Sequence, residues 1–379
     1  MRKLLVFILA AVLVCGGILP QAAAETQENY QYTVKEDGTA EITEVNKECK
    51  DSAIPAELDG HKVTSIGNYA FSTCRNMKID TIPEGITSIG EGVFMYCDKI
   101  QSIRLPEGLT AIGENAFAFC SNLQSVSIPE SVTEIGEGVF MDCPKLKTIE
   151  IPRENPAYVF SSKALISKKD MAMISYADAR GGDYEIPWGI TRIGRGTFCS
   201  SKVKSVVIPD SVTAIGPQAF WKCANLTDVY IPKSVKTIEN QAFLQCAKLK
   251  AIAIPDSVTE MGNGVFGWNK NLQTIEITPD HPAYEMNGQL LIRKTDGRLM
   301  CALASVKGSL EIPDGVKSIA DQAFSGCDKL KELIIPDSVE EIEGPIFTGS
   351  NRLVCKVTAG SKAEEWCVFF GISHEAISQ

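Results

Sequence analysis

The sequence predicts a mainly β repeat solenoid of about twelve coils, and three observations support this fold class. An Ile-Pro or Leu-Pro pair recurs along the chain, most often 23 residues after the previous pair. One phenylalanine per unit recurs in the same register, and so do the apolar positions around it. A single unit of this length cannot enclose a core, so the coils must stack and bury equivalent positions against one another.

The Ile-Pro pairs set the register of the coils. Their first residues are Ile54, Ile82, Leu105, Ile128, Ile151, Ile186, Ile208, Ile231, Ile254, Ile312 and Ile335, and Ile277 holds the same place before a threonine. Residues 146–151 alternate between apolar and polar side chains, which predicts a short parallel strand with one buried face that Pro152 ends. We expect such strands near residues 100–105, 123–128, 146–151, 203–208, 226–231, 249–254, 272–277 and 330–335. A second extended stretch, such as residues 132–135, should line the opposite side of each coil.

The phenylalanine column should form a buried spine through the stack. Its members are Phe71, Phe94, Phe117, Phe140, Phe198, Phe220, Phe243, Phe266, Phe324 and Phe347.

Another column contains seven cysteines, Cys74, Cys97, Cys120, Cys143, Cys223, Cys246 and Cys327, together with Ser201, Asn269 and Ser350. We interpret it as a ladder of small buried side chains that hydrogen-bond neighbouring coils. Disulfides between adjacent coils are the alternative, because the coil spacing lies within the Cα range that a disulfide allows. Cys355 and Cys367 form a separate candidate pair near the C-terminus.

Two coils are longer than the others. Residues 151–186 and 277–312 each span 35 residues from one anchor to the next. Within them, the alternating segments 164–175 and 289–302 predict β-hairpins. We expect these hairpins to project beside the strands as paired walls.

The N-terminal residues 1–24 predict a secretory signal peptide, because a positive start is followed by an apolar run and a small-residue cleavage site near Ala24. Lipid attachment at Cys15 is the disfavoured alternative, since Val14 fits poorly before it. The predicted location is therefore secreted, extracellular or at the cell surface.

The remaining chain divides into three parts. Residues 25–53 predict an N-terminal capping hairpin, residues 54–354 contain the repeats, and residues 355–379 predict a C-terminal cap. The cap should contain a short helix over residues 361–370 with Ser361 as its N-cap. Such caps shield the open ends of a solenoid core.

Charge and motifs exclude several functions. Cleavage after Ala24 removes two positive charges and no negative one, which takes the formal net charge from −10 to −12. An acidic chain argues against nucleic acid as a partner. No second apolar stretch predicts a transmembrane segment, and no catalytic motif appears around the three histidines, so we expect no enzyme activity, no cofactor and no metal site.

The repeat resembles the BspA-type leucine-rich repeats of bacterial surface and secreted proteins. The resemblance covers about residues 54–354 and is nearly complete over residues 208–232, which contain the Ile-Pro pairs, the Ile-Gly pair, the Ala-Phe pair and the cysteine. It implies a right-handed leucine-rich-repeat superhelix without catalysis. It also implies adhesion or protein binding, in some members to host extracellular-matrix proteins or to other bacteria.

Two sets of exposed positions are candidates for ligand binding. The larger side chains on the predicted strand face are Arg104, Glu150, Tyr230 and Glu276, of which Tyr230 is the best anchor because it combines a large contact area with a polar tip. The alternative is an aromatic patch just after the spine phenylalanines, which contains Tyr96, Phe119, Trp221 and Trp268. These aromatic side chains either form an exposed patch or fold back over the edge of the coils.

The function predicted from these features is binding of an extracellular protein or glycan, which the sequence does not identify. One alternative is a structural or self-associating envelope protein without a host ligand. Another is a carbohydrate-binding module, which would need several exposed aromatic side chains along one groove.

Overall fold

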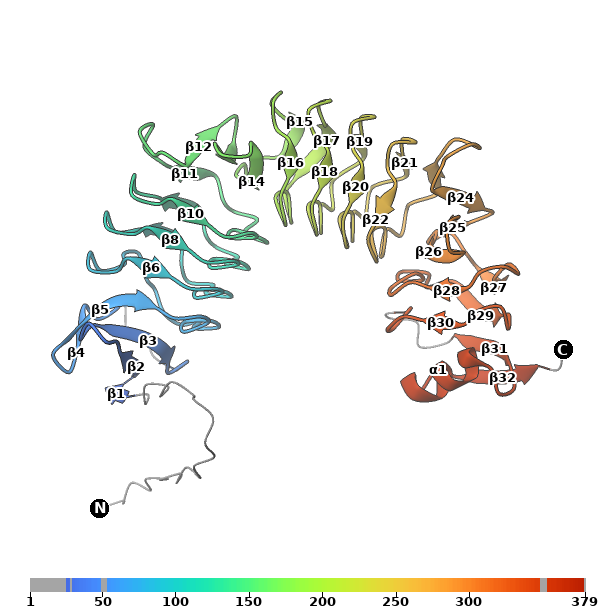
Figure 1. Ribbon diagram of the computed structural model, residues 1–379, viewed down its shortest axis with the longest axis horizontal. Coiled ribbons are helices and arrows are strands. Elements are labelled where there is room, and N and C mark those ends of the chain that lie inside the picture. The colour runs from blue at the N-terminus through green and yellow to red at the C-terminus, as the bar shows by residue number, and fades with distance from the viewer. Residues whose placement is uncertain (1–24, 28, 49–52, 348–352, 378–379) are drawn as a thin grey trace, which may run out of the picture.

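The computed structural model describes residues 25–27, 29–48, 53–347 and 353–377, so the predicted signal peptide lies outside the described residues. The chain forms a β-solenoid of about 14 turns with a period of about 23 residues. Its coils stack into an arch, with the first and last coils at the two feet (Figure 1). The predicted fold class is therefore confirmed, with about two more turns than expected.

The first row of strands precedes the Ile-Pro pairs and forms what we call the strand face. It consists of β7 (Ser102–Arg104), β9 (Ser125–Ser127), β11 (Thr148–Glu150), β15 (Gly182–Glu185), β17 (Val203–Val207), β19 (Asp228–Tyr230), β21 (Ala251–Ala253), β23 (Thr274–Glu276), β27 (Gly308–Glu311) and β29 (Leu330–Ile335). Within each sheet these strands pair in parallel, for example Ile103 with Val126. Eight of them lie within the ranges that the sequence predicted, whereas β15 and β27, which belong to the long coils, lie outside those ranges.

A second row of short strands forms the opposite wall. It consists of β6 (Ser88–Ile89), β8 (Ala111–Ile112), β10 (Glu134–Ile135), β16 (Arg192–Ile193), β18 (Ala214–Ile215), β20 (Thr237–Ile238), β22 (Glu260–Met261), β28 (Ser318–Ile319) and β30 (Glu341–Ile342). The loop after each short strand points to the inside of the arch, whereas the turn before it lies on the outside (Figure 1). We call the former the inner-edge loops; they contain the Ala-Phe pair and the cysteine of each repeat.

The phenylalanine column is a buried spine, as predicted, except that Phe347 at its end is only partly buried. Within the middle of the chain, Phe198, Phe220 and Phe243 stack with ring centroids 4.9 and 5.0 Å apart and ring planes within 4° of parallel. All three rings are fully buried. Stacking follows because each coil places its phenylalanine directly on that of the previous coil.

The cysteine column is a hydrogen-bonding ladder. The thiol of Cys120 donates to the carbonyl oxygen of Phe94 at 3.1 Å, and that of Cys246 donates to Phe220 at 3.2 Å. Asn269 makes the same contact with its amide, 2.9 Å from the carbonyl oxygen of Phe243. The eleven cysteines in the described part of the chain are buried, and the structure joins none of them in a disulfide. The ladder interpretation is therefore confirmed for Cys120, Cys246 and Asn269, whereas Ser350 lies outside the described residues.

Each long coil adds three antiparallel strands to the opposite wall. The first adds β12 (Tyr158–Ser161), β13 (Ala164–Ser167) and β14 (Ala172–Tyr176), and the second adds β24 (Tyr284–Asn287), β25 (Leu290–Arg293) and β26 (Arg298–Ala302). The hairpins expected at residues 164–175 and 289–302 are present as β13–β14 and β25–β26.

The expectation that these hairpins project as walls is wrong. Every residue of β13 is buried, and its successive side chains enter different cores: Leu165 packs with the residues before it, whereas Ala164 and Ile166 pack with those after it. β25 divides the next two cores in the same way. A strand can do this because its side chains alternate between its two sides. The hairpins are therefore partitions inside the solenoid.

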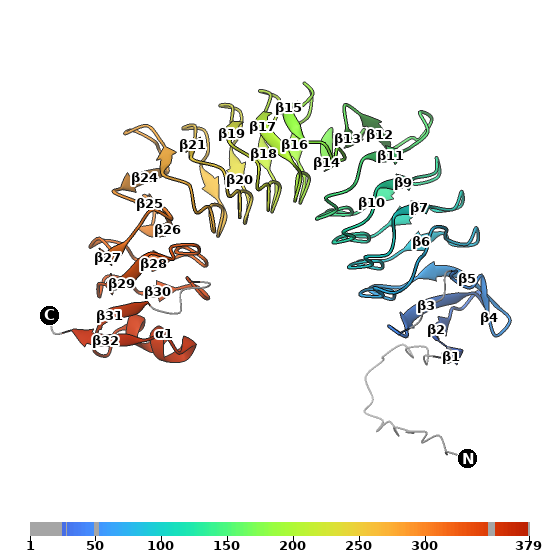
Figure 2. The ribbon, with the colours of Figure 1, turned by 180° about the vertical axis from the view of Figure 1, so that it is seen from behind.

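The partitions divide the arch into three blocks with separate hydrophobic cores. The first block precedes residue 152, the middle block spans residues 186–277, and the last block begins at residue 312. We call the junctions the first and second bend. Figure 2 shows the same three groups of coils from behind.

The bends arise because each long coil, although it contains more residues overall, has a shorter loop than the other coils on the inside of the arch. Only five residues separate β14 from β15, whereas nine separate β16 from β17. The inner-edge loops on either side therefore meet directly. At the second bend, the backbone N–H of Trp268 donates to the carbonyl oxygen of Ser325 at 2.8 Å, which bypasses the long coil.

Both ends of the solenoid extend its sheets. At the N-terminal end, β1 (Glu25–Gln27), β2 (Tyr30–Val34) and β3 (Ala40–Val45) form an antiparallel set, and β4 (Glu57–Leu58) pairs with β5 (His61–Ile66). β3 pairs in parallel with β5 and so starts the opposite wall.

At the C-terminal end, β31 (Val354–Thr358) and β32 (His374–Ile377) continue the strand face around α1 (Lys362–Phe370). The helix is capped by Ser361, as predicted.

Candidate binding surfaces

The four candidate residues of the strand face are all exposed, but they lie on three separate sheets. Arg104 and Glu150 belong to the sheet of β7, β9 and β11, Tyr230 to that of β15, β17 and β19, and Glu276 to the pair β21–β23. The strand face is therefore divided into separate sheets, and no hairpin walls flank these four residues.

The middle block presents the most apolar part of the strand face. Val207 and Tyr230 are register partners on β17 and β19, with 45% and 56% of their surfaces exposed. The backbone N–H of Ile208 donates to the carbonyl oxygen of Tyr230 at 3.3 Å, which holds the two strands together beneath these side chains. Large exposed apolar side chains on a rigid sheet are typical of interaction surfaces.

Trp188 is the residue that the sequence analysis missed. It lies in the outer turn between β15 and β16, and 85% of its surface is exposed. The signal was present in the repeat, since the equivalent positions in the following coils are the charged residues Asp210 and Lys233. Because a large apolar side chain is exposed where the following coils have charged residues, Trp188 joins the candidate surface of the middle block.

In the first block, Arg104 and Glu150 line the same hollow, of about 340 Å³. Small hydroxyl side chains, Ser102, Ser125 and Ser127, form its floor. Arg104 also approaches Glu107 at 3.9 Å, and both side chains are about two-thirds exposed. An ion pair this open contributes little to stability, so Arg104 remains available to a ligand.

The aromatic patch is split by the structure. Tyr96 stacks on Phe119 with centroids 4.6 Å apart, and Phe119 meets the edge of Trp221 at 6.0 Å. The ammonium group of Lys222 lies 4.3 Å from the Trp221 ring and 2.7 Å from a carboxylate oxygen of Asp142. These aromatic rings are half-buried and pack across the first bend.

Trp268 lies apart from that cluster, at the second bend. Its backbone N–H donates a hydrogen bond to Ser325 in the last block, and the ammonium group of Lys270 lies 5.3 Å from its ring. The four aromatic residues thus join neighbouring blocks in two places and do not form one exposed patch.

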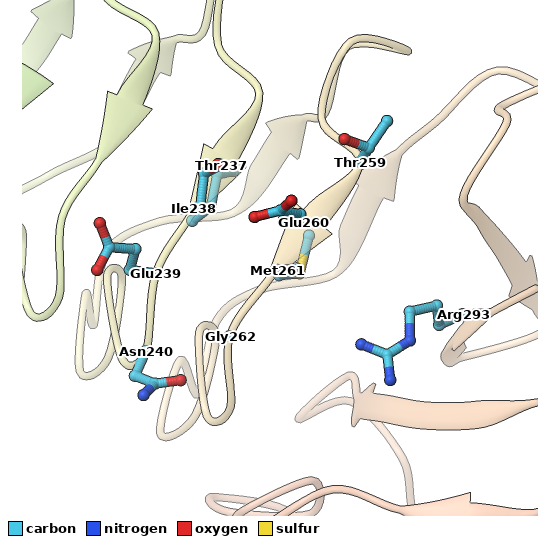
Figure 3. A pocket seen from close by; sticks show the side chains of 9 residues that line it. All are labelled: Thr237, Ile238, Glu239, Asn240, Thr259, Glu260, Met261, Gly262 and Arg293. Atoms are coloured by element: carbon cyan, nitrogen blue, oxygen red, sulfur yellow. The ribbon is translucent and has the colours of Figure 1, made fainter. Parts of the chain in front are cut away.

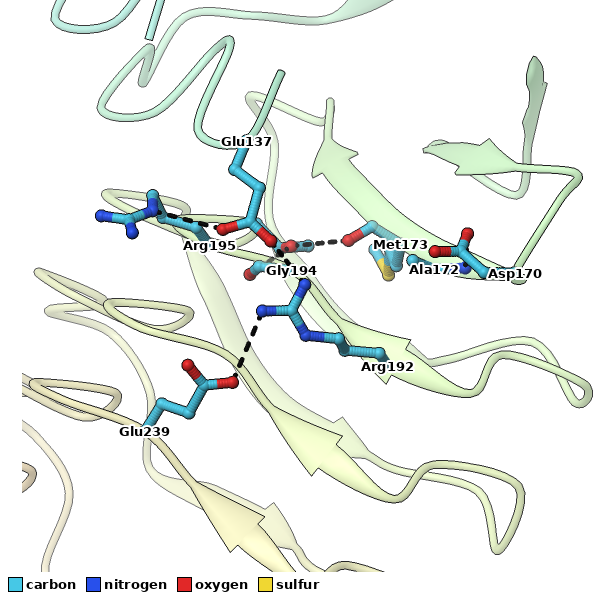
Figure 4. Close-up of polar contacts among 9 residues, drawn as sticks. Glu137, Asp170, Ala172, Met173, Arg192, Gly194, Arg195 and Glu239 are labelled. Atoms are coloured by element: carbon cyan, nitrogen blue, oxygen red, sulfur yellow. Dashed lines mark hydrogen bonds and ion pairs between the residues drawn. The ribbon is translucent and has the colours of Figure 1, made fainter. Parts of the chain in front are cut away.

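Charged side chains join the blocks on the opposite wall. At the first bend, Arg192 lies between Glu137 and Glu239, with nitrogen–oxygen distances of 2.5 and 3.4 Å, and Arg195 also reaches Glu137 at 3.4 Å (Figure 4). Burial alone would raise the pKa of Glu137, but the two arginines outweigh it and hold the pKa below its ordinary value of 4.5. At the second bend, Arg298 binds Glu343 through both terminal nitrogens.

A hollow of about 270 Å³ opens beside the second bend (Figure 3). One side comes from β20, β22 and the residues that follow them, including Glu239, Asn240 and Glu260, and the other comes from Arg293 of β25. The guanidinium group of Arg293 is held by Asp296 at 2.6 and 3.0 Å. Asp296 therefore offsets the positive charge of Arg293, and the charge that this hollow offers to a ligand is that of its glutamates.

The buried thiols of the repeat coils are poor nucleophiles. Burial raises the pKa of Cys120, Cys223 and Cys301 to about 12, so almost none of these thiols ionises at neutral pH. Within the described ranges, no group of three or more His, Cys, Asp or Glu side chains is placed to hold a metal ion. The same residues contain no helix long and apolar enough to cross a membrane.

These features define a leucine-rich-repeat solenoid whose candidate sites are surfaces. Residues 48–166, 180–285 and 304–365 match the BspA type leucine rich repeat region, in six copies. The chain belongs to this family, as the resemblance in its sequence indicated.

The fold is also similar to that of solved bacterial proteins. The crystal structure of the pneumococcal vaccine antigen PcpA is 18% identical, with a TM-score of 0.56, and the match covers 94% of this chain and 99% of that one. A leucine-rich cell surface protein from Faecalibacterium prausnitzii is 23% identical, with a TM-score of 0.45 and coverage of 95% and 100%. A comparison with curated proteins gave no match. The likeness to PcpA supports the fold alone.

Proposed function

We propose that this protein is a secreted or cell-surface binding protein, and that its middle block binds an extracellular protein through the strand face. The observation that carries the proposal is the adjacent pair Val207 and Tyr230, which are 45% and 56% exposed on a sheet held rigid by the core beneath it. A tyrosine so placed buries a large area at a small cost in side-chain entropy.

Trp188 enlarges this surface on the outer side, and Glu276 flanks it two coils further along the middle block. Arg104 and Glu150 form a separate polar surface in the first block. The proposal therefore makes Tyr230 the anchor and treats Arg104, Glu150 and Glu276 as secondary contacts. Family membership supports a location outside the cell, and we propose that the chain is cleaved near Ala24 on export.

The proposal is tested with residues 25–379 purified and passed over an array of immobilised extracellular-matrix proteins and glycans. We expect binding to at least one protein, with a weaker signal for Tyr230→Ala. The matched control is Thr274→Ala, an exposed residue of the same strand face.

Two results would contradict the proposal. One is binding to glycans alone, and the other is a defined oligomer in size-exclusion chromatography with light scattering that binds no array component. The first outcome would favour a carbohydrate-binding module, and the second a self-associating envelope protein.

A further inference from the structure

The C-terminal cap contains two cysteines that do not belong to the cysteine ladder. Cys355 lies on β31 and Cys367 on α1, and both are fully buried in the core of the last block. The ladder thiols, such as that of Cys120, donate to a backbone carbonyl of the preceding coil. Among the described residues, neither Cys355 nor Cys367 has such a backbone acceptor, and each thiol interacts with the other instead.

The backbone holds the two cysteines side by side, although they lie on different elements. The N–H of Ile372 donates to the carbonyl oxygen of Cys367 at 2.8 Å, and the N–H of Cys355 donates to that of Ser373 at 2.9 Å. Because Ile372 and Ser373 are consecutive, one short segment after α1 bonds to both cysteines. This closeness matters because a disulfide requires two cysteines whose Cα atoms lie within about 7 Å.

The two thiols differ in reactivity. The Cys355 thiol, as a hydrogen-bond donor, lowers the pKa of Cys367, and the nearby His374 adds to this effect although burial opposes it. The same contact, together with burial, raises the pKa of Cys355. The thiolate is the nucleophile in thiol–disulfide exchange. Cys367 is therefore the attacking sulfur of the pair, whereas the ladder thiols remain protonated.

The helix that carries Cys367 is held to the last block by one face only. Its buried residues are Ala363, Trp366 and Cys367, and the indole N–H of Trp366 donates to the carbonyl oxygen of Gly344 at 3.0 Å. The ring of Phe369, on the other face, is 81% exposed and adds nothing to this contact. Elements at a chain end open readily unless they are tied down. A covalent bond at Cys367 would fix the helix over the end of the core.

We propose that Cys355 and Cys367 are a redox site, which a low-molecular-weight disulfide such as oxidised glutathione converts into a disulfide that fastens the C-terminal cap. The Cys367 thiolate attacks one sulfur of the small disulfide, breaks its S–S bond and releases one thiolate, which takes a proton from water. The Cys355 sulfur then displaces the second small thiol from the mixed disulfide, and its proton passes to that leaving group. Two protein thiols are oxidised, and one small disulfide is reduced to two thiols.

The reaction takes place while the cap is open, because both sulfurs are shielded in the closed cap. Folding after export supplies that opening, and the space outside the cell supplies the oxidising conditions in which disulfides persist. The proposal therefore uses the proposed location but not the binding surface at Tyr230. Its test requires neither a ligand nor a cell, so its failure would leave the protein-binding proposal untouched.

The test begins with residues 25–379 refolded in a buffer of reduced and oxidised glutathione. After alkylation in denaturant, ten of the twelve cysteines that follow Ala24 should carry the label. Trypsin should then release residues 353–356 linked to residues 363–379, as seen by mass spectrometry. Hydrogen exchange of the α1 amides should become at least about tenfold faster when the bond is reduced, because a disulfide restricts the open state of the cap.

The cysteine ladder supplies the matched control. The double variant Cys223→Ser/Cys246→Ser also loses two buried thiols, in a column where Ser201 already occurs, and it should still give the linked peptides. In Cys355→Ser/Cys367→Ser, reductant should no longer change the exchange of α1. The proposal is overturned if all twelve thiols are labelled after refolding, if the linked peptides contain ladder cysteines instead, or if reduction leaves the exchange of α1 unchanged.

Discussion

Phe220 is the side chain whose removal should destabilise the middle block most. Its ring is fully buried and is stacked on both sides, 4.9 Å from Phe198 and 5.0 Å from Phe243. Its backbone N–H donates to the carbonyl oxygen of Ala242 at 2.8 Å. Because the ladder of the neighbouring coils holds the backbone in place, Phe220→Ala should leave a cavity that cannot collapse.

The expected cost follows from these contacts. Truncating a buried phenylalanine to alanine costs about 3–5 kcal/mol through lost burial and the cavity. Two lost ring contacts, worth about 0.5–1.5 kcal/mol each, place Phe220 at the upper end of that range. Phe140 is 5% exposed at the end of the first block, and its ring lies 5.8 Å from that of Phe117. Phe140→Ala should fall in the same range, near its lower end.

Urea unfolding followed by tryptophan fluorescence measures this directly. Three of the four tryptophans, Trp188, Trp221 and Trp268, lie in the middle block. The Phe220→Ala transition should move to a clearly lower urea concentration, whereas the control Phe369→Ala, which removes a ring that is 81% exposed, should shift stability by less than about 0.5 kcal/mol. An unchanged midpoint for Phe220→Ala would mean that the spine is not the core of the block.

Two further predictions concern the bends and the thiols. The pKa of Glu137 is lowered in the fold, so its stabilising effect is complete well above 4.5 and is lost as the pH falls through that lowered value. Small-angle scattering should show that the arch widens as the pH falls through this value. The Glu137→Gln variant should show a smaller change over the same pH range, and an equal change in the two proteins would contradict this role of Glu137. Most of the twelve cysteines after Ala24 should react with a thiol reagent, without reductant, only after unfolding. Few free thiols in denaturant would indicate disulfides instead.

The features that the sequence predicted correctly are those that every coil repeats. The spine, the cysteine ladder and the strand positions depend only on the register, so aligning the coils was enough to find them. The thiol of Cys120, for instance, donates a hydrogen bond to the preceding coil in the same way as the thiol of Cys246 does.

The bends could not be predicted because they depend on residues far apart in the chain. Glu137 and Arg192 are separated by 55 positions, and Asp142 and Lys222 by 80. The hairpins were expected to project because their alternating pattern suits a half-exposed strand. Only the structure shows that the second side of β13 faces another core, to which Ala164 and Ile166 contribute. Trp188 lies in an outer turn between β15 and β16, where the alternating strand pattern does not extend.

The central claim is that the strand face of the middle block, and not the aromatic residues at the bends, binds the partner. The decisive measurement is the dissociation constant for a matrix protein found on the array, by surface plasmon resonance, at a temperature at which every variant is folded. We predict that Tyr230→Ala weakens binding by about 1–3 kcal/mol, whereas the double variant Trp221→Ala/Trp268→Ala keeps most of the affinity. If the double variant abolishes binding and Tyr230→Ala leaves it unchanged, the strand-face account is wrong and the bends are the site.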